Sequence, residues 1–108
     1  LFLGVAYKPD IDDARESPAL EVMSLVAHKG AKVLYHDPYI LEVTDEHGHH
    51  WKGLELTDEI LASADCVVFT TNHSCFDVEH IVEKAQLVVD MRNAVKRVSI
   101  EDGKVFKL

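Results

Sequence analysis

Basic residues, long apolar runs and a secretion signal are all scarce or missing in this chain of 108 residues. Eleven Lys and Arg stand against 19 Asp and Glu, for a formal net charge of −8, so neither a nucleic acid nor an anionic membrane is an expected partner. No apolar run approaches the roughly 18 residues of a transmembrane helix. The amino end has no basic stretch of the kind that opens a signal peptide, and we therefore expect a cytoplasmic location.

Cysteine is also scarce, since Cys66 and Cys75 are the only two. Without a secretion signal we expect both to stay reduced. Cys66 falls in an apolar segment, where it is expected to be inert packing. Cys75 lies near His73, which makes a Cys/His nucleophile conceivable, but the sequence offers no evident third group to orient it.

Glycine is missing where a dinucleotide site would need it. A Rossmann site carries G-x-G-x-x-G between its first strand and helix, and this stretch holds Gly4 alone. Asp37 stands where a ribose-binding acid would lie. Without the glycines, a structural Asp-Pro turn is the preferred interpretation of Asp37, and the chain is not expected to hold the pyrophosphate of NAD by itself.

What the sequence does contain is an alternation of apolar runs and amphipathic segments. This predicts an α/β fold with a Rossmann-like, doubly wound, mostly parallel sheet and helices on both faces. Strands are expected within residues 1–7, 31–36, 64–70, 86–90 and 104–107, the last at an edge. Helices are expected after the caps Ser17, Thr57 and Asp77, the first of them ending at Gly30. One domain, residues 1–108, is expected.

Residues 39–56 are the least regular segment. We expect residues 45–52 to form an exposed loop, and its histidines (His47, His49 and His50) to be solvated rather than to bind a metal. Tyr39 and Trp51 are expected to be packing residues or loop anchors.

The basic residues are not spread evenly. All three arginines, Arg15, Arg92 and Arg97, follow the first or the fourth expected strand. Two lysines, Lys8 and Lys96, lie in the same two segments. Ligands of open α/β sheets bind outside the carboxyl ends of strands, and arginine suits phosphate or carboxylate groups, so an anion site is one interpretation. The other is a set of surface ion pairs, Arg92 with Asp90 and Arg15 with a neighbouring acid (Asp12, Asp13 or Glu16). Spacing alone slightly favours the ion pairs.

Four blocks of sequence resemble a known family in order and spacing: GVAYKPDIDDARESPALEV, GAKVLYHDPY, ADCVVFTTNHSCFD and VVDMRN. They are similar to the carboxyl-terminal, UDP-binding domain of the UDP-glucose/GDP-mannose dehydrogenase family, and the wording looks closest to bacterial UDP-N-acetylglucosamine 6-dehydrogenases. One departure is Met91, where the family pattern usually has Thr. The resemblance reverses the preference above and favours a ligand site at Lys8 and Arg92.

The resemblance implies an activity that this chain cannot perform alone. Family members use NAD⁺ to oxidise the C6 hydroxyl of a nucleotide sugar to a carboxylate, through a thioester on a cysteine. That cysteine and the NAD-binding domain lie upstream, and neither Cys66 nor Cys75 matches the nucleophile. The sequence also starts inside an apolar run without an initiator Met, so we expect an inactive fragment of a longer enzyme, with no catalytic residue of its own. The alternative is a non-catalytic nucleotide-binding or assembly module with the same fold.

Site residues follow from the same resemblance. It implies that Lys8 and Arg92 contact the UDP-sugar substrate and that Tyr7 packs beside the nucleotide. It implies that Arg15 reaches toward NAD, which is bound mainly by the amino-terminal domain. It also implies that the full-length enzyme forms a homodimer.

Overall fold

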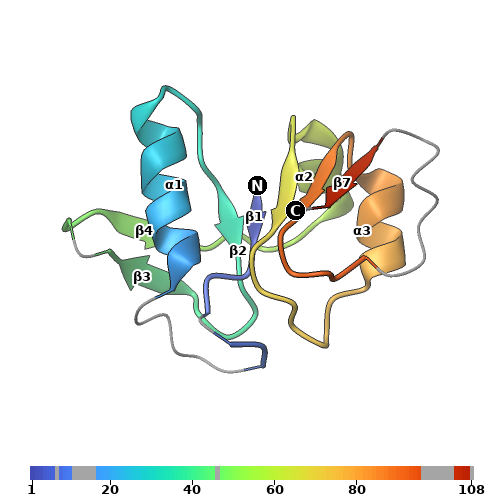
Figure 1. The fold of residues 1–108 in the computed structure, drawn as a ribbon, viewed down its shortest axis with the longest axis horizontal. Coiled ribbons are helices and arrows are strands. Elements are labelled where there is room, and N and C mark those ends of the chain that lie inside the picture. Colours follow the sequence, from blue (N-terminus) through green and yellow to red (C-terminus); the bar gives the residue numbers. More distant parts are fainter. Residues whose placement is uncertain (7, 11–16, 46, 96–103, 108) are drawn as a thin grey trace.

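A single sheet of five parallel strands forms the centre of the computed structural model, which describes residues 1–6, 8–10, 17–45, 47–95 and 104–107 (Figure 1). Its strand order is β2-β1-β5-β6-β7, and every neighbouring pair in it is parallel. The strands are β1 (Phe2–Leu3), β2 (Tyr35–His36), β5 (Val67–Phe69), β6 (Val88–Asp90) and β7 (Val105–Lys107). They lie within the predicted ranges but are shorter, and β7 lies at an edge as predicted.

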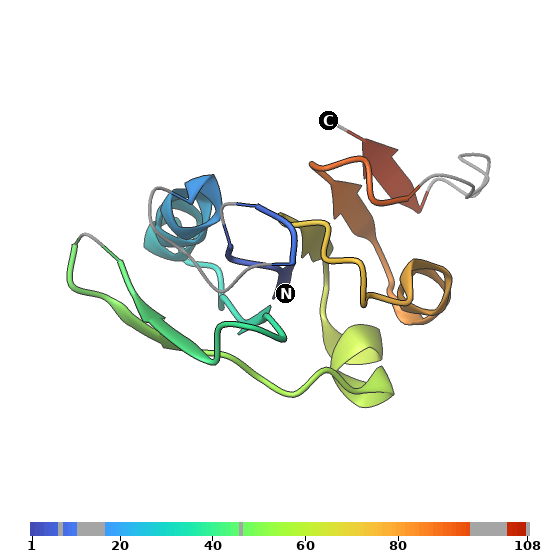
Figure 2. The same ribbon diagram turned by 90° about the horizontal axis from the view of Figure 1, so that it is seen from below.

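In the described part of the chain, three helices flank the sheet, α1 (Pro18–His28), α2 (Asp58–Ser63) and α3 (Val78–Lys84). Each begins after its predicted cap, whose side-chain oxygen accepts a backbone N–H of the first turn. Gly30, at a φ of +100°, follows α1 at the position where a left-handed residue commonly ends a helix. Figure 2 shows α1 on one side of the sheet and α2 and α3 on the other, which confirms the doubly wound prediction. None of the described helices is long and apolar enough to cross a membrane.

The two faces of the sheet carry separate hydrophobic clusters. Under α2 and α3, the cluster contains Leu3, Leu61, Phe69 and Ile81, with exposed fractions of 0–2%. Under α1, it contains Phe2, Val5, Met23, Tyr35 and Ile40. From α1, Met23 is fully buried in this cluster, and Val22 and Val26 pack against it.

The prediction of an exposed loop at residues 45–52 is wrong. Strands β3 (Glu42–Thr44) and β4 (His50–Lys52) form an antiparallel hairpin in which Val43 lies opposite Trp51. Both of these residues pack against the cluster under α1, while their neighbours in sequence face outward. The Asp45 carboxylate accepts the N–H groups of His47 and His49, each at 2.9 Å, which fixes the turn.

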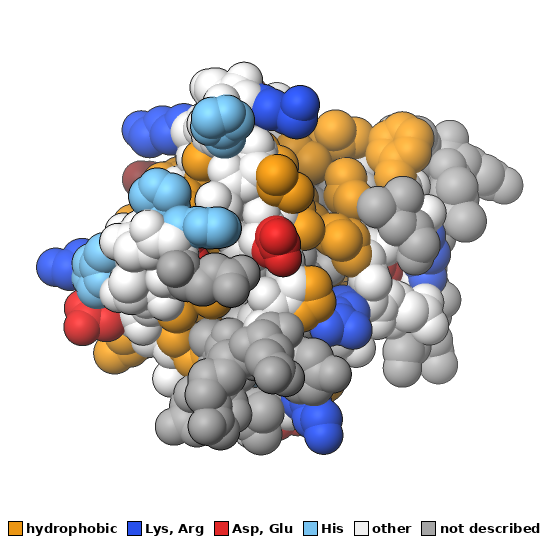
Figure 3. Space-filling model, turned by 60° about the vertical axis from the view of Figure 1, so that its left-hand side comes forward, with side chains coloured by type: hydrophobic (Ala, Val, Ile, Leu, Met, Phe, Trp, Pro, Cys, Tyr) orange, Lys and Arg blue, Asp and Glu red, His pale blue; other side chains and the backbone are white. Residues whose placement is uncertain are grey.

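One part of the sheet is less covered than the rest. Beside α1, an open hollow of about 830 Å³ lies over β5 and β6, and Figure 3 shows hydrophobic side chains gathered beside the helix. Val68, Val89 and Met91 are among its lining residues. Parallel sheets are normally covered on both faces, so this hollow is a surface suited to a further layer of protein.

The strand order places a ligand crevice at a definite point. From β1 the chain passes to β2 on one side, and it returns later to β5 on the other side of β1. In open α/β sheets, ligands bind outside the carboxyl ends of the strands where the order reverses in this way. Here that point lies between the ends of β1 and β5.

Candidate functional site

Hydrogen bonds from two threonines join the segments that follow β1 and β5. Thr70 donates its hydroxyl to the carbonyl oxygens of Leu3, at 3.2 Å, and of Gly4, while Thr71 donates to the carbonyl oxygen of Ala6 at 2.7 Å. Gly4 has a φ of +90°, and a Cβ there would lie 2.8 Å from the carbonyl oxygen of Thr71. The absence of a side chain at Gly4 therefore allows the two segments to lie in contact.

Arg92 follows β6 and is anchored at the same edge. Its Nε donates to the carbonyl oxygen of Thr70 at 3.1 Å, and its side chain is exposed. Within the described part of the chain, no carboxylate lies at ion-pair distance from its guanidinium. The Nε bond fixes the plane of the guanidinium, whose Nη atoms make no hydrogen bond to a described residue.

The predicted Arg92–Asp90 ion pair is wrong. The Asp90 carboxylate is fully buried and accepts three backbone N–H groups, those of Arg92, Ala94 and Val95, at 2.8–3.1 Å. Asp90 therefore shapes the loop after β6 without neutralising the guanidinium. The alternative ion pairs of Arg15 fall outside the described residues, as do Tyr7, Arg15, Lys96 and Arg97 themselves.

A hollow of about 210 Å³ lies beside Arg92. Its walls come from the start of α1, from Thr70 after β5 and from Met91 and Arg92 after β6. The amino end of a helix carries partial positive charge, so this hollow joins a guanidinium to a second favourable group for an anion. We call it the strand-end crevice, since Thr70, Met91 and Arg92 follow the ends of β5 and β6.

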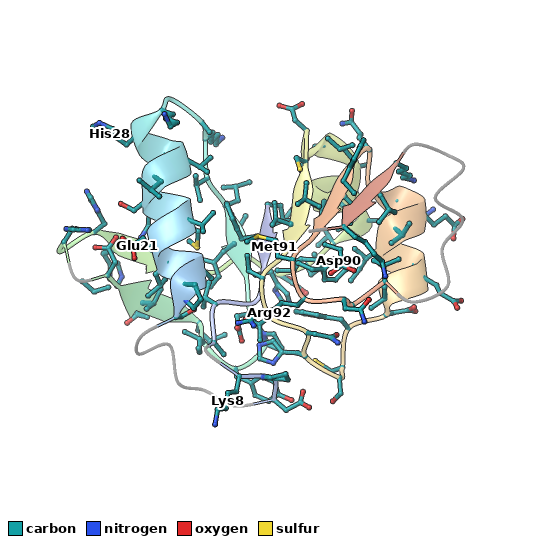
Figure 4. The ribbon with its side chains drawn as sticks, in the orientation of Figure 1. Lys8, Glu21, His28, Asp90, Met91 and Arg92 are labelled. Carbon is teal, nitrogen blue, oxygen red and sulfur yellow. The ribbon has the colours of Figure 1, made fainter. Side chains whose placement is uncertain are left out.

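Lys8 lies farther out along the same edge. Figure 4 shows both Lys8 and Arg92 at the end of the sheet where α1 begins, with Lys8 at the outer surface. The structure thus brings the two described candidate cations to one side of the molecule. Lys8 is exposed and stands two residues before Asp10, which is firmly held.

Sequence reasoning missed the group that holds Asp10. The backbone N–H of Asp10 donates to Nδ1 of His73 at 2.8 Å, and its carboxylate accepts the N–H and hydroxyl of Ser74 at 2.7 and 3.0 Å. The Ser74 backbone N–H is the main cause of a lowered pKa at Asp10. The other ring nitrogen of His73, Nε2, lies 2.9 Å from Oδ2 of Asp37. A sequence signal existed, because Asp37 and His73 each follow a strand that neighbours β1.

Asp37 has the structural role predicted for it. Its carboxylate is buried and accepts the N–H groups of Val5, Tyr39 and Ile40 as well as the bond from His73. A carboxylate with four protein donors has little capacity left for a ribose hydroxyl.

The Cys/His nucleophile finds no support in the geometry. Both nitrogens of His73 are occupied by Asp37 and Asp10, and Cys75 is exposed beside it. Cys66 is half-buried just before β5, and burial raises the pKa of its thiol, as expected of an inert cysteine. In the part of the chain that the structure describes, no group of three His, Cys, Asp or Glu is placed to hold a metal.

The two aromatic residues expected to anchor loops have the following positions. Trp51 packs in the cluster under α1, and its indole N–H lies 3.4 Å from the Asp45 carboxylate. The exposed ring of Tyr39 lies 4.9 Å, centroid to centroid, from the ring of His73. Both contacts fit the predicted packing roles.

Comparison with known proteins decides the family. Residues 1–97 match the family model described as "UDP-glucose/GDP-mannose dehydrogenase family, UDP binding domain". The chain belongs to this family. The predicted resemblance and the Rossmann-like α/β class are both confirmed.

Relatives of this UDP binding domain come from bacteria and archaea. UDP-N-acetyl-D-mannosamine dehydrogenase of Escherichia coli K12 is 42% identical over 77 residues, which are 69% of this chain and 18% of the relative. UDP-glucose 6-dehydrogenase of Rickettsia bellii is 31% identical over 106 residues, or 92% of this chain and 24% of the relative. The chain therefore spans about a fifth to a quarter of the length of these relatives.

Solved structures agree with this placement. UDP-D-ManNAc dehydrogenase of Pyrococcus horikoshii superposes with a TM-score of 0.73 at 25% identity, over 98% of this chain and 24% of that one. NDP-N-acetyl-D-galactosaminuronic acid dehydrogenase of Methanosarcina mazei Go1 gives a TM-score of 0.76 at 23% identity, covering 99% and 23%, and supports the fold alone.

Proposed function

We propose that this chain is the carboxyl-terminal, UDP-sugar-binding domain of a longer NAD-dependent dehydrogenase, which oxidises the C6 hydroxyl of a UDP-sugar to a carboxylate. The observation that supports this best is the Arg92 guanidinium, which Thr70 holds at the strand-end crevice. In a chain of net charge −8, a cation fixed at that point and left without a carboxylate partner among the described residues suits an anionic ligand.

The pyrophosphate of UDP is the group that the described cations suit best. The planar fork of Arg92 can bind two phosphate oxygens at once, whereas Lys8 supplies a single point charge at the outer edge. Tyr7 is assigned beside the nucleotide on the family resemblance. We infer UDP-glucose or a UDP-N-acetylhexosamine as the sugar, because both kinds of substrate appear in the names of the relatives.

NAD is assigned mainly to another part of the longer enzyme. When bound, NAD⁺ accepts the hydride removed from the sugar alcohol. The single glycine after β1 is already required by the contact between Gly4 and Thr71, so the described residues provide no glycine-rich cradle for a dinucleotide. Arg15 is the residue of this chain proposed to reach toward that cofactor.

A longer protein also explains the hollow beside α1. Its lining of Val68, Val89 and Met91 would be costly to leave in water, and the remaining part of the enzyme is the occupant that the relatives' lengths suggest. The amino-terminal domain of the same chain and, by resemblance, a second subunit of a homodimer are the proposed partners.

Titration of the chain with UDP, followed by amide chemical shifts, tests this proposal. We expect weak binding that falls with salt, with shifts centred on residues 8–10 and 91–93. Because charged hydrogen bonds contribute about 1.5–3 kcal/mol, Arg92→Ala should weaken binding by about tenfold or more, and Arg92→Lys should restore only part of it.

Lys52→Ala provides a matched control, since Lys52 is exposed on the hairpin away from the crevice. It removes one positive charge and should leave the affinity for UDP almost unchanged. Equal losses in Lys52→Ala and Lys8→Ala would indicate nonspecific attraction. An absence of shifts near Arg92 at millimolar UDP would reject the site.

A further inference from the structure

The imidazole of His73 is held by hydrogen bonds at both nitrogens. Nε2 lies 2.9 Å from the Asp37 carboxylate, and Nδ1 accepts the backbone N–H of Asp10 at 2.8 Å. The side chain is fully buried, so no solvent competes for these positions. The ring lies in a gap between loops that follow three different strands.

These partners determine the protonation of the ring. A carboxylate only accepts hydrogen bonds, so Nε2 must carry the hydrogen, and a backbone N–H only donates, so Nδ1 must present its lone pair. His73 is therefore neutral and in its Nε2–H tautomer. A proton on Nδ1 would face the Asp10 N–H and remove that bond.

Asp37 anchors one side of the ring, and the other side of the ring holds Asp10. Asp37 is itself anchored by backbone N–H groups of Val5, Tyr39 and Ile40. Asp10 adopts a φ of +64°, a left-handed conformation that an L residue rarely takes without support. His73 and Ser74 supply that support through three hydrogen bonds to Asp10.

Lys8 is tied to Asp10 by Pro9. The ring of Pro9 fixes its own φ near −65°, and it confines Lys8 to an extended backbone. Once Asp10 is anchored, few backbone rotations remain by which Lys8 can move relative to the sheet. The position of Lys8 therefore depends on the bond between Asp10 and His73.

We propose that His73 is a positioning residue for the UDP-sugar site, which holds the segment Lys8–Pro9–Asp10 so that Lys8 faces the anionic ligand. This inference rests on the proposed role of Lys8 in binding UDP. His73 touches no ligand in this scheme and acts through Asp10. Among the described residues, the rings of Tyr39 and Phe76 lie 4.9 and 5.5 Å from its own, and the Asp10 carboxylate lies 3.9 Å from Nδ1.

Two amide variants separate the functional bond from the structural one. In His73→Asn, the side-chain oxygen can lie near the position of Nδ1 and accept from Asp10, but the donor to Asp37 is lost. In His73→Gln, the side-chain nitrogen can lie near Nε2 and donate to Asp37, but the acceptor for Asp10 is lost. We expect His73→Gln to weaken UDP binding by about tenfold and His73→Asn by clearly less. This order of affinities should hold even if His73→Gln has the higher melting temperature.

Combined variants show whether His73 acts through Lys8. In a Lys8→Ala background, His73→Gln should cause no further loss of affinity, whereas in an Arg92→Ala background its tenfold effect should remain. An equal effect in both backgrounds would mean a general structural role and would overturn the inference. If Lys8→Ala alone leaves the affinity unchanged, the proposed role of Lys8 fails instead, so the two failures are distinguishable.

A measurement on the unsubstituted chain guards against variants that do not fold. Nitrogen-15 NMR should show His73 with a protonated Nε2 and an unprotonated Nδ1. It should also show a scalar coupling across the hydrogen bond between the Asp10 amide nitrogen and Nδ1. A protonated Nδ1, or a missing coupling in a well-resolved spectrum, would overturn the inference without any substitution.

Discussion

The Asp58 carboxylate lies 2.6 Å from Nε2 of His80, a contact that joins the first turn of α2 to the first turn of α3. The Asp58 side chain is 62% exposed and that of His80 is 41% exposed. The hydrogen bond from His80 is the main cause of a lowered pKa at Asp58, and the same bond raises the pKa of His80. The contact is therefore strongest when Asp58 is ionised and His80 is protonated.

Stability should depend on pH through this pair. The contribution of His80 is complete below its unfolded pKa of about 6.5 and is lost as the pH rises through its raised folded value. The contribution of Asp58 is complete above its unfolded pKa of about 3.9 and is lost as the pH falls through its lowered folded value. His80→Gln should therefore lower the melting temperature more at about pH 5.5 than at about pH 8.5.

Asp58→Asn is the matched background for that experiment. With the carboxylate removed, His80→Gln should lower the melting temperature by the same amount at both pH values. A pH-dependent difference that persists in Asp58→Asn would show that His80 responds to another group.

Tyr35 is a second group with a clear effect of burial. Its hydroxyl donates to the carbonyl oxygen of Ile40 at 3.0 Å, and burial is the main reason that its pKa rises to about 12. Tyr35→Phe would leave that buried carbonyl without its donor, so we expect a loss of about 1–2 kcal/mol in the free energy of unfolding, measured with urea.

Alkaline titration gives an independent measurement on Tyr35. Because its folded pKa exceeds the unfolded value of about 10, its contribution to stability is complete below pH 10 and declines as the pH rises toward 12. Tyrosinate absorbance should therefore keep a late component near pH 12 that Tyr35→Phe removes. A late component that survives in Tyr35→Phe would assign the raised pKa to another tyrosine.

Gly4 and Gly48 form a natural pair for testing close approach. Both have positive φ values, +90° and +84°, but a Cβ at Gly4 would meet Thr71 while one at Gly48 would meet nothing within 4 Å. We expect Gly48→Ala to cost about 1 kcal/mol for its backbone conformation alone. Gly4→Ala should cost about 2–4 kcal/mol, since overpacking adds to the same conformational cost. Equal losses in urea unfolding would mean that the contact with Thr71 carries no cost.

Helices were the elements that the sequence predicted best. Ser17, Thr57 and Asp77 are caps whose side chains bond within one turn, so the signal and the structure lie in the same few residues. The hairpin was missed for the opposite reason. Its outward side is polar and rich in histidine, and only Val43 and Trp51 show the inward alternation, across a turn that separates them.

The candidate site likewise contains residues that the sequence predicted and hydrogen bonds that it did not. The family resemblance favoured Lys8 and Arg92, and both follow expected strands whose carboxyl ends share one edge of the sheet. The bonds of His73 were not predicted, since they reach 36 residues to Asp37 and 63 to Asp10. Those pairings exist only once β2 and β5 lie on either side of β1, which is information held in the strand order.

The large sequence separation of these hydrogen-bonded residues also affects the rate of folding. Bonds that assemble the strand-end edge span up to 67 residues, as between Thr70 and Leu3, so each closes a large loop before it contributes any stability. Contacts of such high contact order form slowly, and no short piece of the chain can form them alone. During folding, the edge proposed to receive UDP should therefore become ordered only after the two halves of the sheet have joined at β1.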